Sequence, residues 1–255
     1  MNKKQQEEQR RQEDQALKQG LLWVAGAVVL EVLLFLISRY AYDYDATAQG
    51  VAIAEGLRAA LNTTRILGGV LVLAGVALAL IQGKKNTKAG WCVSMAVVGA
   101  VLLLCAHVSL TYQNSGLRML YLLVPVLGGL AMSYYIYQRD FFLAALPGVA
   151  AVLGLWFVRV GGVGLEVLAT VLVCVAVLIA VLKLKKGNGA LNLGEKPLRI
   201  LPEKVNYTVA LVSGVASVAV QAVAAVAGSA LAYYLIFAMG AWLFALLVYH
   251  TVKML

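Results

Sequence analysis

Glu31 is a single carboxylate near the middle of a long apolar stretch, in the sequence VVLEVLLF. A charged side chain at the centre of a bilayer costs roughly 2.5–3.5 kcal/mol on insertion scales. Glu31 must therefore face other helices, carry a proton or have a partner. Two interpretations follow: a site that couples to protons or cations or contacts a ligand, and a neutral carboxyl group that is hydrogen-bonded to a neighbouring helix.

A second group of polar residues falls at the ends of apolar stretches, on the side of the membrane that the charge pattern below assigns to the outside. Its members are Arg39, Arg65, His107, Arg118, Arg159 and Glu166. Arginines that converge from different helices suit an anionic ligand such as a phosphate or a carboxylate. Alternatively, arginines at span ends commonly reach to the interface, Arg159 could pair with Glu166, and a lone His107 is typical of a hydrogen-bonded bundle residue.

Small and hydroxylated residues share one face of the seventh predicted span. They are Ala210, Ser213, Gly214, Ser217, Gln221, Ala224, Ala225 and Gly228. Such a stripe favours close contact between helices, within the chain or with a second copy, and Gln221 can hydrogen-bond across the contact. A polar lining for a pore or cavity is the alternative. The same pattern recurs in two earlier spans, at Gly68, Gly75 and Ala79 and at Ala96, Gly99 and Ala100.

Motifs for catalysis, metal binding or cofactor binding are absent from the sequence. It has no His-Glu-x-x-His, no Gly-x-Ser-x-Gly and no phosphate-binding glycine loop. The three cysteines, Cys92, Cys105 and Cys174, lie in apolar stretches without the spacing of metal ligands. We therefore expect no metal ion and no cofactor, and the sequence favours a role other than that of an enzyme.

The composition requires a membrane to position these residues. Hydrophobic residues make up 62% of the chain and charged residues 13%, whereas soluble domains have roughly 45–50% and 25%. A bilayer needs about 20 helical residues per crossing, and the apolar stretches are continuous rather than alternating, which favours helices over barrel strands. The sequence predicts an all-α integral membrane protein, a polytopic bundle of about eight transmembrane helices. The predicted spans are 20–38, 66–82, 90–110, 119–137, 141–158, 163–184, 205–227 and 230–252.

Three polar segments flank these spans. Residues 1–19 form a polar cytoplasmic tail, helical or frayed, and residues 20–255 a single transmembrane domain. Residues 39–65 are predicted as an external loop with a short interfacial helix over part of its length. Residues 185–204 are a cytoplasmic loop in which Pro197 and Pro202 favour a strap along the membrane face. This strap would separate the last two spans from the others.

The distribution of basic residues predicts the orientation. Of the 21 Lys and Arg residues, all except Arg39, Arg58, Arg65, Arg118 and Arg159 fall on one side of the predicted spans. Because cytoplasmic loops are enriched in Lys and Arg, both termini are predicted to be cytoplasmic. This asymmetry accounts for the net charge of +9 without a nucleic-acid partner. The lack of eukaryotic sorting signals and of extended tails favours the inner (plasma) membrane of a bacterium.

Three functions remain compatible with the sequence. The first is a small transporter or permease-like bundle with Glu31 and the external arginines near its path. The second is a non-catalytic membrane subunit that assembles with itself or with a partner membrane protein. The third is a protein or enzyme that binds lipid or lipid-linked substrates at the outer leaflet.

Overall fold

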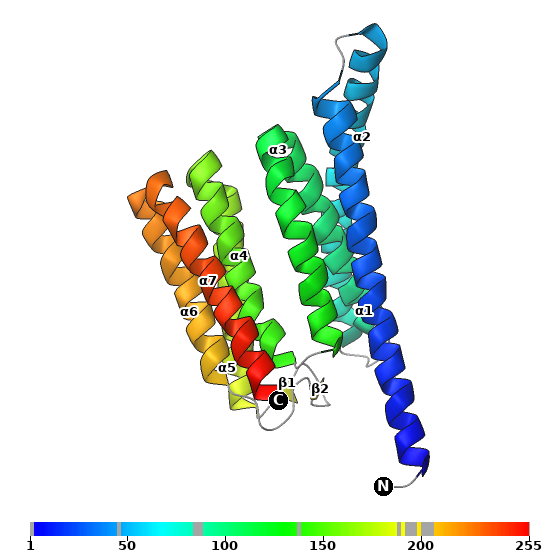
Figure 1. Ribbon diagram of the computed structural model, residues 1–255, viewed down its shortest axis with the longest axis vertical. Helices are drawn as coiled ribbons and strands as arrows, with labels where there is room; N and C mark the ends of the chain where they lie inside the picture. The colour runs from blue at the N-terminus through cyan, green and yellow to red at the C-terminus, as the bar shows by residue number, and fades with distance from the viewer. Residues whose placement is uncertain are drawn as a thin grey trace. The chain divides into compact units, whose positions relative to one another are not determined.

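The computed structural model is built almost entirely of α-helices (Figure 1). It describes residues 3–44, 47–83, 89–136, 139–187, 190–191, 198–199 and 207–254. The helices are α1 (Lys3–Ile37), the π-helix η1 (Ser38–Tyr42), α2 (Ala48–Gly83), α3 (Ala89–Ile136), α4 (Arg139–Gly161), α5 (Leu165–Lys186), α6 (Tyr207–Ala227) and α7 (Ser229–Met254). Two short strands, β1 (Ala190–Leu191) and β2 (Leu198–Arg199), pair antiparallel. The rest of the predicted strap, with Pro197 and Pro202, lies outside the described residues.

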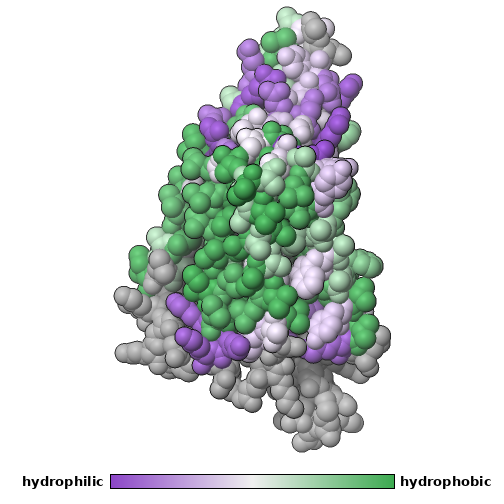
Figure 2. All heavy atoms as spheres, turned by 90° about the vertical axis from the view of Figure 1, so that its left-hand side faces the viewer, coloured by the Kyte–Doolittle hydropathy of each residue, from purple (hydrophilic) through white to green (hydrophobic). Residues whose placement is uncertain are grey.

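Among the described residues, 7 helices are long and apolar enough to cross a membrane. Large apolar side chains point outwards from them, such as Leu73, Leu165 and Val226, the last with 91% of its surface exposed. On the face drawn in Figure 2, hydrophobic residues form a broad zone with hydrophilic residues beyond it. Exposed apolar side chains on this scale require lipid around them. The all-α membrane fold predicted from the sequence is confirmed.

Helix α3 consists of two helical halves, 89–112 and 114–136. Gln113 between them has φ 48° and ψ −128°, outside the helical region. A Cβ on Gly116 would collide with the backbone oxygen of Val108, although eight residues of straight helix would separate these positions by about 12 Å. The chain therefore reverses here, and the two halves lie side by side in Figure 1. The sequence QNSG at the reversal is typical of a turn.

The predicted external loop 39–65 is much shorter in the structure. Helix α2 begins at Ala48 and runs without interruption through the predicted start of the second span at Ile66. Glu55, Arg58, Asn62 and Arg65 recur at intervals of three or four residues, so they share one face of this helix. These polar residues lower the local hydropathy, but no proline interrupts the helix. The helical part of the segment is thus longer than predicted, and its external position stays a prediction. Likewise, the tail predicted as helical or frayed is helical from Lys3 onwards.

Contacts divide the chain into two compact units. The amino-terminal unit contains Val24–Gly128, and the carboxy-terminal unit contains Gly129–Asn192 and Pro197–Leu255 together with Met1–Trp23. The division thus falls within α1 and α3, and the predicted strap does not separate the last two spans from the others. The reason is that α4 packs against α6 and α7, on the far side of that strap. That both units form one transmembrane domain stays a prediction.

In the amino-terminal unit, α2 and the first half of α3 are in backbone contact. A Cβ on Gly75 would lie 2.7 Å from the backbone nitrogen of Ala96, and a Cβ on Gly68 would lie 2.7 Å from that of Leu103. From the other side, a Cβ on Gly99 would lie 2.9 Å from the backbone nitrogen of Val72. The two helices are therefore antiparallel and approach closely at glycine and alanine, the arrangement that small residues permit in membranes.

In the carboxy-terminal unit, α4 is the central helix. It packs against α5, α6 and α7, and 72% of its most apolar segment is buried, compared with 17–33% for those three. Small residues make this possible: a Cβ on Gly148 would lie 2.7 Å from Leu243 of α7. On α6, a Cβ on Gly214 would lie 2.7 Å from Leu178 of α5. Helix α4 is thus enclosed by protein, while its neighbours present their outer faces to lipid.

The contact between α2 and α3 predicts opposite effects for two Gly→Ala substitutions. Gly75→Ala should lower stability by about 1–3 kcal/mol, because its methyl group collides with Ala96. Gly26→Ala should leave stability unchanged or raise it slightly, since nothing lies within 4 Å of the new methyl group and Ala is the better helix former. Thermal unfolding in lipid nanodiscs measures both. Equal melting temperatures for the two variants would contradict the packing described.

Candidate functional site

Glu31 lies on the face of α1 that packs inside the amino-terminal unit. Ala27 and Leu34 are four residues before it and three residues after it, so all three share one side of the helix. Leu34 is 2% exposed, and its carbonyl oxygen accepts a hydrogen bond of 3.3 Å from the Tyr121 hydroxyl group. A Cβ on Gly128 would lie 2.8 Å from the Ala27 Cβ atom. Glu31 therefore faces the second half of α3 rather than the bilayer.

The carboxyl group of Glu31 is incompletely satisfied. Its Oε1 atom is buried and has no hydrogen-bond partner among the described residues. The group lies close enough to Cys105, on the first half of α3, to interact with it electrostatically. A buried polar atom without a partner costs free energy unless it is protonated, hydrated or bound. Glu31 is thus placed to bind a proton, a cation or a polar ligand inside this unit.

At the other end of α1, the π-helix η1 joins three helices. The Tyr42 hydroxyl group donates a hydrogen bond to the backbone oxygen of Ser109 on α3. Arg58 of α2 donates one of 3.2 Å to the backbone oxygen of Ala41, and its guanidinium group lies 5.5 Å from the Tyr42 ring centre. Tyr42 and Arg58 thus hold the end of α1 against α2 and α3. The regular spacing of polar residues on α2 was the sequence feature that could have indicated this role of Arg58.

The residues predicted to surround an external anion site are divided between the two units. In the amino-terminal unit, Arg65 donates a hydrogen bond of 2.7 Å to Asn62 on its own helix. Arg118 is exposed and His107 is half-buried. In the same unit Arg39 is exposed on η1. All four residues belong to the amino-terminal unit, and an anion site among them remains a prediction.

The two remaining members of that set lie in the carboxy-terminal unit. The Arg159 guanidinium group stacks over the Tyr233 ring of α7, 4.3 Å from its centre. This cation–π contact fixes the end of α4 against α7. Glu166 is in the first turn of α5, and its carboxylate lies 2.8 Å from where a Cβ on Gly164 would be. Its position at a helix N-terminus is electrostatically favourable.

The predicted stripe on α6 lies inside the carboxy-terminal unit. Ala210, Ser213, Gly214, Ser217, Gln221 and Ala224 are buried, whereas Gly228, with φ +86°, forms the turn to α7. Gln221 accepts a hydrogen bond of 2.8 Å from the Thr170 hydroxyl group of α5. It donates to the backbone oxygen of Ser217 at 3.2 Å and to the Cys174 sulfur at 3.3 Å. These bonds satisfy the Gln221 amide, which suits helix packing better than the lining of an aqueous pore.

A second polar contact joins α4, α6 and α7. The Ser213 hydroxyl group donates a hydrogen bond of 2.6 Å to the backbone oxygen of Ala144 and accepts one of 3.1 Å from the Trp242 indole. Ser213 therefore joins α4 and α7 through its hydroxyl group.

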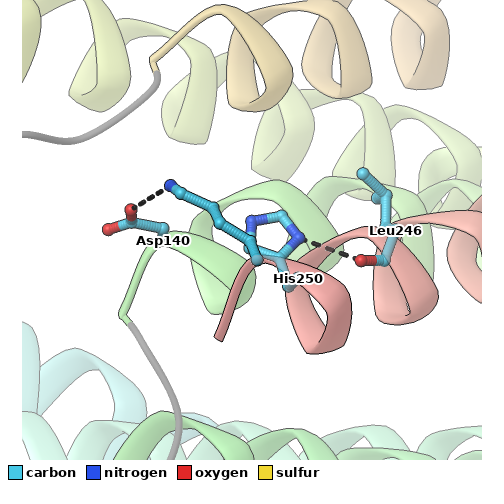
Figure 3. Close-up of polar contacts among 4 residues, drawn as sticks. Asp140, Leu246 and His250 are labelled. Atoms are coloured by element: carbon cyan, nitrogen blue, oxygen red, sulfur yellow. Dashed lines mark hydrogen bonds and ion pairs between the residues drawn. The ribbon is translucent and has the colours of Figure 1, made fainter. Parts of the chain in front are cut away.

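Sequence reasoning missed a cluster of ionisable residues in the carboxy-terminal unit (Figure 3). Asp140 begins α4 and His250 ends α7, and both are buried, with 8% and 6% of their surface exposed. The Lys253 ammonium group lies 3.8 Å from Asp140 Oδ2, and Tyr207 begins α6 beside them. These residues are far apart in the sequence, and each sits at a span end, where polar residues are expected. The sequence therefore held no signal that would have joined them.

Comparisons with known proteins add no information about the site. No protein-family model matches the chain, and no curated protein or solved structure matches it.

Proposed function

We propose that this chain is a small membrane transporter in which Glu31 is the protonatable group that couples transport to a proton or cation gradient. The observation that carries the proposal is the buried Oε1 atom of Glu31, which has no hydrogen-bond partner among the described residues. Ionisable residues at membrane depth are costly and typically mark proton relays or substrate paths. Glu31 faces protein and not lipid, as a coupling residue must.

The division into two compact units supports the same function. Many transporters work by moving one helical bundle against another. Here each unit has its own internal packing: glycine contacts between α2 and α3 in one, and the enclosure of α4 in the other.

The second candidate is a non-catalytic subunit of a membrane complex. The satisfied hydrogen bonds of Gln221 favour it, because they describe a side chain that is used for packing. We rank it below transport because it gives no role to the unsatisfied carboxyl group of Glu31. The third candidate, lipid binding by the external arginines, has no comparable support.

Transport predicts proton movement that depends on Glu31. The purified protein is reconstituted in liposomes that contain a pH-sensitive dye, and single amino acids, sugars, organic acids and nucleosides are added outside in turn. At least one solute should change the internal pH. In the Glu31→Gln variant that rate should fall at least about tenfold, because a neutral amide cannot exchange a proton as a carboxyl group does.

Glu55→Gln is the matched control, since it removes an exposed carboxylate from α2 in the same unit. Its rate should equal that of the unmodified protein. Proton movement that is unchanged by Glu31→Gln would remove Glu31 from the mechanism. Failure of every solute to move protons would favour the assembly subunit instead.

We also propose that the chain crosses the plasma membrane of a bacterium eight times, with both termini in the cytoplasm. The reversal at Gln113 supports two crossings by α3, because its apolar segment of 43 residues is about twice the length of one crossing. The lysines at the end of α5 and at the end of α7 support cytoplasmic positions for these ends.

Single-cysteine variants test this topology. The three native cysteines are replaced by alanine, and an impermeant maleimide is added to intact cells. Ser115→Cys, at the exposed reversal of α3, should react before lysis, whereas Lys185→Cys, at the end of α5, should react only after lysis. Protection of Ser115→Cys under both conditions would contradict two crossings, and the opposite pattern of labelling would contradict the orientation.

A further inference from the structure

One end of the carboxy-terminal unit brings together ionisable residues from three helices. Helices α4 and α6 begin there and α7 ends there, so Asp140, Tyr207, His250 and Lys253 occupy the first or last turns of packed helices. Asp140 interacts electrostatically with both His250 and Lys253, and Tyr207 interacts with Asp140. A carboxylate, an imidazole, a phenol and an ammonium group thus share one small region.

Two oxygen atoms in this region are buried and lack partners. Asp140 Oδ1 and the Tyr207 hydroxyl group have no hydrogen-bond partner among the described residues. The other carboxylate oxygen, Oδ2, is paired loosely: the Lys253 ammonium group lies 3.8 Å away and is 34% exposed. A buried carboxylate is costly unless nearby positive charge or a proton compensates it.

His250 can supply that compensation. Its Nδ1 atom lies 2.9 Å from the backbone oxygen of Leu246, as Figure 3 shows. A carbonyl oxygen can only accept, so Nδ1 carries a hydrogen and Nε2 is the atom left to take up a proton. The rings of Phe141 and Tyr249 pack edge-on against the imidazole, at 5.5 and 5.1 Å between centres. They hold the ring in place beside Asp140.

We propose that Asp140, Tyr207, His250 and Lys253 form a proton-binding site, in which the Asp140 carboxylate pairs alternately with Lys253 and with protonated His250. A proton from water adds to Nε2 of His250, and the resulting imidazolium takes the carboxylate from Lys253. When the proton leaves, the ion pair with Lys253 forms again. The site lies in a different unit from Glu31 and does not depend on a role for Glu31.

The surrounding charges agree with a proton as the ligand. Further charged residues at this end include Arg139, which is the first residue of α4, and Lys183, Lys185 and Lys186 in the last turn of α5. With Lys253 already beside Asp140, the local charge is strongly positive, which disfavours a metal cation. A proton on His250 is tolerated because the carboxylate lies beside it, and the exposed Lys253 side chain can move into solvent at little cost.

Nuclear magnetic resonance of labelled histidine tests the site directly. The chain has 2 histidines, and a His107→Gln variant identifies the signal of His250. In lipid nanodiscs, neutral His250 should carry its hydrogen on Nδ1. Lys253→Gln should raise the pH of half-protonation of His250 by about one unit, because the carboxylate loses its competing cation, and Asp140→Asn should lower it by a similar amount.

Lys185→Gln is the matched control, because it removes an exposed lysine from the same end of the unit and should shift the signal far less. A shift for Lys253→Gln no larger than that for Lys185→Gln would overturn the proposal, as would a neutral His250 with its hydrogen on Nε2. Asp140 is buried, so its variant is the one at risk of not folding. The exposed Lys253 variant decides the question on its own.

Discussion

Direct contact between helices at glycine and alanine is the constraint on which both units depend. Lipid is as apolar as the helix faces, so burial of apolar surface does not drive helices together, and close packing with interhelical hydrogen bonds must do so. Gly75 against Ala96 brings α2 and α3 into backbone contact, and Gly154 leaves room for the side chains of Thr170 and Gln221 beside α4. A larger residue at either glycine would separate the helices and remove the contacts next to it.

Close packing also determines which polar groups can take part in function. Gln221 and Ser213 are held by hydrogen bonds from two or more helices, so they have little capacity left for a ligand. Glu31 and Asp140 each keep a buried oxygen atom without a partner among the described residues. Most buried polar atoms in proteins are satisfied. Among the described residues, five side chains have a buried atom without a partner, and Glu31 and Asp140 are the two of them that are carboxyl groups. They are where we expect protons to bind.

Much of the fold could be predicted from the sequence, and the reasons for the remainder are physical. The depth of Glu31 in an apolar stretch and the spacing of small residues on α6 are periodic features of one helix, which a sequence displays directly. The sequence indicated only a short helix in this region, whereas α2 begins at Ala48. Arg58 and its polar neighbours share one face of that helix, and they lower the mean hydropathy of the segment as a whole. The pairing of Asp140 with His250 depends on which helices pack together, and the pattern along one helix does not contain that information.

The central claim is that Glu31 is a protonatable carboxyl group that faces protein within the membrane. Infrared spectroscopy of the protein in lipid nanodiscs measures this directly, because a protonated carboxyl group and a carboxylate absorb at different frequencies. The account predicts a protonated carboxyl band at neutral pH that is absent from the Glu31→Gln variant and disappears from the unmodified protein at alkaline pH. Identical spectra for the two proteins throughout the titration would contradict it.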